Sequence, residues 1–195
     1  LVAVAIEWVR PCKSVVGALR MWFHELGHTF TYWFSGIWAM PSFQLTTPYN
    51  VIPSWFVFFF VTGMFGLAAY AFAKRGCNYP AFSFGFCVVA SCVMFLLMNR
   101  HQTKELAIYM GEGGMFVICT WSIMAFFYRF PEEFNWHQYR YLLTVPSVLV
   151  FYQSYVRWHA IRAGDSVGPF GGLILPNGQA LMSDQSKLVQ YFGWT

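Results

Sequence analysis

The sequence predicts an all-α, polytopic integral membrane protein with about five transmembrane helices. Charged residues make up 10% of the 195 residues, against about 25% in an ordinary globular domain. Hydrophobic residues make up 57% and gather into long runs. A helix needs about 20 such residues to cross the hydrocarbon core of a bilayer. Both the composition and the run lengths therefore indicate membrane-spanning helices.

The low charge content also excludes other classes of protein. So few charges do not cover a water-facing surface, which excludes a soluble domain and a disordered chain. The net charge of +4 comes from 12 basic and 8 acidic residues, too few for a surface that follows nucleic-acid phosphates. We therefore expect the lipid bilayer, and no nucleic acid, as a partner. Residues 1–162 form the expected transmembrane domain, and residues 163–195 a Gly/Pro-rich C-terminal tail.

Each of five runs has the length and apolarity expected of a spanning helix. They cover residues 15–39, 51–73, 81–98, 106–128 and 139–159. The first carries four ionisable residues and the fourth contains Glu112, whereas the second and third are almost free of charge. The fifth contains Pro146, which we expect to kink the helix without ending it, because neighbouring helices can satisfy the freed carbonyls. In the tail, residues 180–192 are compatible with a short surface helix that has Asp184 near its start.

The distribution of Lys and Arg favours a cytoplasmic N-terminus. That orientation places seven Lys and Arg residues at the inner helix ends and five at the outer ends. Basic residues are enriched on the cytoplasmic side of membrane proteins, so the bias indicates the orientation.

The strongest chemical signal is the pentapeptide His24-Glu25-Leu26-Gly27-His28, an HExxH motif. Residues four apart lie on one helix face, so His24 and His28 can bind one metal ion. Zn²⁺ is the expected metal for two imidazoles and a carboxylate, and Glu25 is the expected general base toward a metal-activated water. Ionisable residues are rare within membranes, which favours a functional site. The alternative is a polar seam in which these side chains bind neighbouring helices or line a water cavity.

The third metal ligand is predicted from depth in the membrane. At 1.5 Å per residue, His28 lies about 20 Å from the inner face and Glu112 about 21 Å. Glu112 is therefore the first choice and Asp165, in the tail, the second. The alternative for Glu112 is a protonated side chain in a closely packed, glycine-rich helix contact.

The motif resembles that of site-2-protease-like intramembrane zinc metalloproteases, peptidase family M50. The stretch His24–His28, followed by Trp33, Gly36 and Met40–Phe43, looks like small bacterial M50-like membrane proteins, as does the later Gly111–Glu112 pair. The resemblance implies an intramembrane zinc endopeptidase of the bacterial inner membrane, acting on membrane proteins or peptides. M50 enzymes usually take the third ligand from an Asp-Gly segment, which this sequence lacks. Either Glu112 replaces that ligand or the site is incomplete.

A second hypothesis follows from that departure. The chain is then a catalytically silent M50-like subunit, packed against neighbouring subunits of a larger membrane complex. The 22% aromatic content suits a chain enclosed by partners. Bound metal with three protein ligands discriminates the enzyme from the silent subunit.

Overall fold

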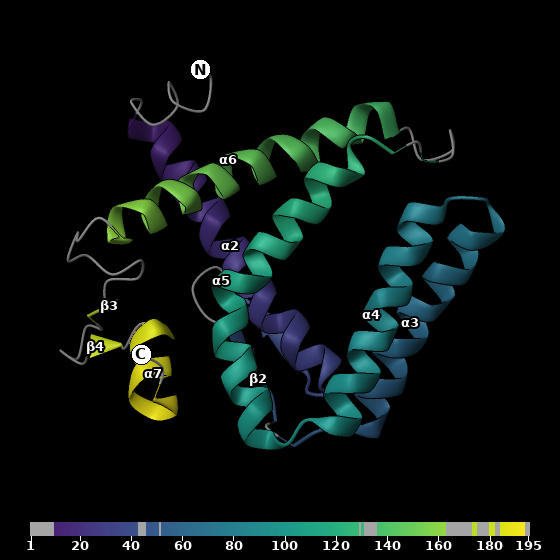
Figure 1. Cartoon of the computed structure of the whole chain (residues 1–195), viewed down its shortest axis with the longest axis horizontal. Coiled ribbons are helices and arrows are strands. Elements are labelled where there is room, and N and C mark those ends of the chain that lie inside the picture. The colour runs from purple at the N-terminus through teal and green to yellow at the C-terminus, as the bar shows by residue number, and fades with distance from the viewer. Residues whose placement is uncertain are drawn as a thin grey trace.

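The computed structural model describes residues 10–42, 46–50, 52–128, 130, 136–162, 173–174, 180–181 and 184–193. This part of the chain is mostly helical, as predicted (Figure 1). In chain order its elements are α2 (Arg10–Phe34), β1 (Ala39–Pro41), β2 (Thr46–Pro48), α3 (Trp55–Lys74), α4 (Asn78–Leu97), α5 (Arg100–Ala125), α6 (Trp136–Arg162), β3 (Leu173–Ile174), β4 (Ala180–Leu181) and α7 (Asp184–Phe192).

Helix α2, which carries the HExxH motif, ends at Phe34, so its predicted extension to residue 39 was wrong. Gly36 has a φ of 73°, a left-handed conformation that glycine adopts without steric cost. The amide of Ile37 donates to the carbonyl of Tyr32 (2.8 Å) and closes the last turn. The chain then forms a hairpin in which β1 and β2 pair antiparallel. This hairpin returns toward α2 and supplies one of the site residues.

Helices α3 and α4 form an antiparallel pair joined by a short turn at Gly76, whose φ is 70°. They confirm the helices predicted at 51–73 and 81–98, with differences of a few residues that are common at helix ends. Aromatic stacking holds the pair together: the rings of Phe58 and Phe95 lie 4.3 Å apart at 13°. Figure 1 shows the two helices side by side, apart from the crossing of α2, α5 and α6.

Helix α5 begins well before the predicted start at residue 106 because a capping box precedes the apolar run. The Asn99 side chain accepts from the Gln102 amide (2.9 Å), and the Gln102 side chain accepts from the Asn99 amide (3.0 Å). The helix predicted at 139–159 is α6, which continues through Pro146 as expected.

Among the described residues, three helices are long and apolar enough to cross a membrane: α3, α4 and α5. Large apolar side chains such as Phe56, Leu67 and Phe82 lie exposed on α3 and α4. In lipid these exposed surfaces are stable, whereas in water so extensive an apolar surface is not. Helices α2 and α6 are comparably long but are not among these three. The described structure therefore indicates a membrane protein, and the prediction of five spans remains a prediction.

Helices α2 and α5 pack closely because glycines meet at their crossing. A Cβ on Gly27 of α2 would clash with the backbone carbonyl of Met110 on α5. Small residues allow helix backbones to approach in membranes, where dispersion contacts drive association. This close approach places α5 directly against the face of α2 that carries both histidines.

The tail contributes a helix that docks near this crossing. Helix α7 was predicted within residues 180–192, and the structure has it over Asp184–Phe192. Leu188 is buried, and the ring of Phe192 lies 4.8 Å from the ring of His101 on α5. Figure 1 shows α7 beside the first half of α5. The end of the tail is therefore a packed helix.

Candidate metal centre

His24 and His28 point the same way from α2, as the spacing of the motif predicts. Their Nε2 atoms lie 3.0 Å apart and their ring centroids 4.6 Å apart. The imidazoles face α5 and are largely shielded, with side chains 4% and 12% exposed. Two imidazole nitrogens this close, in a shielded place, form a natural metal-binding pair.

The third member of the cluster is Asp184, at the start of α7. Its Oδ2 lies 3.0 Å from His24 Nε2 and 3.1 Å from His28 Nε2. The two nitrogens and the oxygen therefore form a nearly equilateral triangle. Asp184 is 160 positions from His24 in the sequence, so α7 must dock for the triangle to form.

The triangle fits a zinc ion by its dimensions. With donor bonds of about 2.0–2.1 Å, two ligands of tetrahedral zinc lie about 3.3–3.4 Å apart. The three donor atoms lie only slightly closer together than this. Hydrogen bonds account for at most two of the three contacts, because each Nε2 carries at most one hydrogen. A cation at the centre satisfies all three atoms at once.

Gly111 on α5 provides the room for this arrangement. A Cβ at position 111 would lie 2.6 Å from His24 Nε2 and 2.5 Å from His28 Cε1. Any side chain here would therefore enter the space that both imidazoles share. The absence of a side chain at Gly111 therefore leaves the space in which the two imidazoles of the motif meet.

Two of the three donor residues, His28 and Asp184, have a hydrogen-bond partner on the side away from the triangle. His28 Nδ1 lies 2.6 Å from the carbonyl oxygen of Ala107, which favours a proton on Nδ1 and leaves the Nε2 lone pair for a metal. Asp184 Oδ1 accepts from Lys187 Nζ at 2.8 Å. Burial alone would raise the pKa of Asp184, but in the absence of a metal, hydrogen bonds from protonated nitrogens of His24 and His28 lower it well below its ordinary value. The carboxylate is therefore ionised, as a metal ligand must be.

Glu25 lies beside the triangle, as predicted for a general base. Ligand atoms of His24, Glu25 and His28 all lie within 4.8 Å of one another, so the three residues form a potential metal-binding group. The hydroxyl of Thr46, on β2, donates to Glu25 Oε2 at 2.7 Å. This bond fixes the carboxylate while its second oxygen stays available to take up a proton. The sequence analysis did not identify Thr46, since nothing in the motif points to the hairpin.

Of the two predicted third ligands, Glu112 lies near His24 but on the other side of the ring. Its Oε1 lies 3.7 Å from His24 Nδ1 and accepts from Arg20 Nη2 at 2.7 Å. We predicted Glu112 level with His28, whereas its carboxylate lies beside His24, at the ring nitrogen that faces away from the triangle. Asp165, the second choice, lies outside the described residues.

The sequence analysis did not include Asp184 among the candidate ligands, because its local signal is ordinary. An acidic residue in the first turn of a short amphipathic helix is common, since it interacts favourably with the helix dipole. Nothing nearby resembles a ligand motif. Only the docking of α7 against α5 distinguishes this aspartate from a surface residue.

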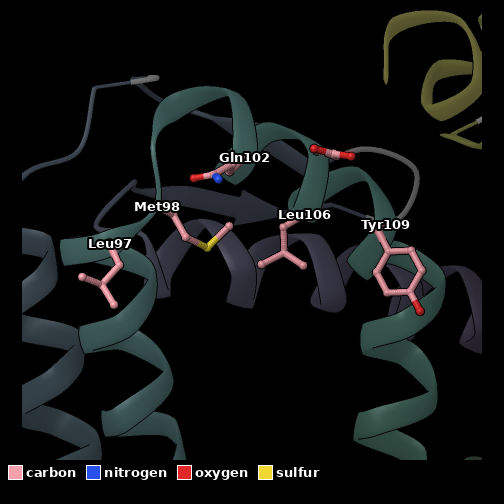
Figure 2. A pocket seen from close by; sticks show the side chains of 6 residues that line it. Leu97, Met98, Gln102, Leu106 and Tyr109 are labelled. Atoms are coloured by element: carbon pink, nitrogen blue, oxygen red, sulfur yellow. The ribbon is translucent and has the colours of Figure 1, made fainter. Parts of the chain in front are cut away.

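A separate surface pocket lies where α4 passes into α5 (Figure 2). None of its lining residues belongs to the His–His–Asp triangle. They are Leu97, Met98, Gln102, Glu105, Leu106 and Tyr109. This pocket is open and has no grouping of donor atoms comparable to the triangle, so it is not the candidate site.

The fold and the site together define a helical protein with membrane-length apolar helices and a shielded His–His–Asp cluster beside a glutamate. Comparison with protein-family models, with curated proteins and with solved structures finds no match. The geometry of the site is therefore the basis on which a function is inferred.

Proposed function

We propose that this protein is an intramembrane zinc metalloendopeptidase of the M50, or site-2-protease-like, kind. The observation that carries the proposal is the triangle of His24 Nε2, His28 Nε2 and Asp184 Oδ2, with sides of 3.0–3.1 Å. Two nitrogens and one carboxylate oxygen leave one tetrahedral position open, as in hydrolytic zinc sites. The HExxH motif supplies the same residue types that such enzymes use.

Zinc, when bound, supplies a Lewis acid that polarises a carbonyl and lowers the pKa of water. The protein supplies the remaining parts. Glu25 takes a proton at its free carboxylate oxygen and can return it to the leaving amine. Thr46 holds the other oxygen of Glu25 at 2.7 Å, and the shielded surroundings strengthen every charge interaction in the site.

The setting suggests the substrate class. Helix α5, which packs against both histidines, is itself long and apolar enough to cross a membrane. The scissile bond then belongs to a membrane protein or peptide, within or close to the bilayer. We further propose that α2 and α6 also span, which gives five helices, a cytoplasmic N-terminus and a bacterial inner-membrane location.

A catalytically silent subunit is the second candidate, and one observation favours it. Asp184 Oδ2 lies within hydrogen-bond distance of both imidazoles, so two protonated nitrogens can bind it without a metal. In that state the cluster joins α7 to α2 as a structural contact. The chain then serves a larger membrane complex.

Metal analysis separates the two candidates. Purified wild-type protein in detergent should contain about one zinc per chain, and His24→Ala and Asp184→Ala should lose it. Zinc absent from wild type after incubation with Zn²⁺ would overturn the enzyme and favour the silent subunit. Glu112→Ala is measured beside these variants, because Glu112 is the third ligand that the depth in the membrane predicted.

Activity is tested with a fluorescently labelled single-span peptide in phosphatidylethanolamine and phosphatidylglycerol vesicles. We expect wild type to cleave it and Glu25→Gln to retain zinc while losing about 10²–10⁴-fold in rate, the usual contribution of a general base. Glu25→Gln that cleaves like wild type would overturn the assigned role of Glu25.

A further inference from the structure

A charged pair lies buried between α2, α5 and α6. Arg20 Nη2 donates to Glu112 Oε1 at 2.7 Å, and the side chains are only 6% and 12% exposed. Arg20 Nε also donates to the Ser154 hydroxyl at 3.1 Å, and Trp158 Nε1 donates to Glu112 Oε2 at 3.2 Å. Burying two charges costs several kcal/mol per ion before their attraction offsets it. Replacement by apolar residues would cost less, so the pair calls for a role beyond packing.

The position of the pair indicates that role. Arg20 lies one helical turn before His24 on α2, so both side chains share a face. Glu112 Oε1 lies 3.7 Å from His24 Nδ1, whereas His24 Nε2 faces Asp184. The carboxylate therefore approaches the ring nitrogen that points away from the donor triangle.

A carboxylate at this nitrogen has a definite chemical effect. Its negative charge favours a proton on Nδ1 over a proton on Nε2, which leaves the Nε2 lone pair free. In metal sites, a group bound to the far nitrogen of a histidine fixes the tautomer and raises the basicity of the ligand. The Ala107 carbonyl oxygen lies in this position for His28 at 2.6 Å, and the Glu112 carboxylate lies 3.7 Å from the corresponding nitrogen of His24.

Arg20 and Trp158 explain why Glu112 remains in this place. Each donates to a different oxygen of the carboxylate, so both oxygens are held away from the donor triangle. The Arg20 guanidinium lies against this carboxylate at 2.7 Å, so Glu112 is held in place beside Nδ1.

We propose that Glu112, held by Arg20 and Trp158, is a positioning residue that sets the Nδ1–H tautomer of His24 for metal binding. This inference rests on the proposed metal centre. It gives the two histidines different partners, a neutral carbonyl for His28 and a charged carboxylate for His24.

Cobalt titration of the full chain in detergent tests the proposal, because Co²⁺ reports both affinity and ligand geometry in its visible spectrum. Glu112→Gln should weaken Co²⁺ binding by about 10–100-fold and shift the spectrum, with three protein ligands still bound. Ser154→Ala is the matched control, since it removes a partner of Arg20 without changing the carboxylate. It should bind Co²⁺ like wild type.

A double variant controls for misfolding that the loss of only one charge of the pair could cause. Arg20→Leu with Glu112→Leu removes both members of the buried pair and should show the same loss of affinity. Nitrogen NMR of labelled histidine should show His24 as the Nδ1–H tautomer in wild type and a mixture in the double variant.

Three results would overturn the positioning role. Unchanged Co²⁺ affinity and spectrum in both Glu112 variants would show that the Arg20–Glu112 pair is only structural. Loss of a ligand in Glu112→Gln, with binding retained in Asp184→Ala, would make Glu112 itself a ligand. Wild type that binds neither cobalt nor zinc would overturn the metal centre and the positioning role together.

Discussion

Gly114 of α5 lies directly over Gly27 of α2, so closely that a Cβ on Gly114 would stand 2.7 Å from the Gly27 Cα. This contact sets the distance between the helix that carries the histidines and the helix that carries Gly111 and Glu112. The spacing of the site is therefore determined by backbone against backbone, with no side chain between them.

The first prediction concerns this contact. Gly114→Ala should destabilise the protein by about 1–3 kcal/mol, the usual cost of overpacking, because a backbone cannot move aside as a side chain can. The gain in helix propensity, about 1 kcal/mol, offsets only part of it. Thermal unfolding in detergent measures the change. Gly63→Ala on α3 is the control, because a Cβ there meets nothing within 4 Å; equal melting temperatures for the two variants would contradict the prediction.

The second prediction concerns Gly111. Gly111→Ala should lower zinc affinity by more than about tenfold, or about 1.4 kcal/mol, because the new methyl group displaces His24 and His28 from their shared position. The obstacle is made of side-chain atoms, which can rotate, so the fold should survive. Zinc competition with a chromophoric chelator gives the affinity, and circular dichroism gives the helix content. If folded Gly111→Ala bound zinc as tightly as wild type, the two imidazoles would not meet beside position 111.

The third prediction compares two residues of α7. Asp184→Asn should reduce zinc affinity by at least about 100-fold, because it removes the charged ligand. Lys187→Met should reduce it by less than tenfold. The Lys187 side chain is 34% exposed, and so exposed an ion pair contributes about 0–1 kcal/mol. The same chelator competition measures both, and a larger effect for Lys187→Met than for Asp184→Asn would exclude Asp184 as the ligand.

The fourth prediction concerns removal of the metal. Chelation should speed hydrogen exchange in α7 and leave α4 unchanged, because a ligand present at 100 times its dissociation constant stabilises the docked state by about 2.7 kcal/mol. Exchange measured by mass spectrometry with and without chelator tests this. In Asp184→Ala, α7 should exchange rapidly in both conditions. If α7 were equally protected from exchange in chelated and zinc-loaded wild type, metal binding would not stabilise the docking of α7.

The sequence allowed prediction of the helical class and the approximate positions of α3 to α6, because long apolar runs have few alternatives to helix in lipid. Helix ends were predicted less well. The end of α2 depends on Gly36 and the start of α5 on the Asn99 side chain, and both are local effects that hydropathy does not register.

The site was predictable only where its residues are neighbours in the chain. His24, Glu25 and His28 come together through helix periodicity alone. Asp184 and Thr46 reach the site through the docking of α7 and the return of the hairpin. Such long-range contacts depend on packing between elements. Depth along the helices predicted Glu112 level with His28, whereas its side chain lies beside His24, where Arg20 and Trp158 bind it.

The long separation between His24 and Asp184 has a consequence for biosynthesis. A ribosome adding about 5–20 residues per second makes Asp184 roughly ten to thirty seconds after His24, because 160 positions separate them. Helices α3, α4 and α5 are synthesised in that interval. The two histidines are therefore synthesised before the aspartate exists, and the His–His–Asp cluster can form only after the helices between them have been made.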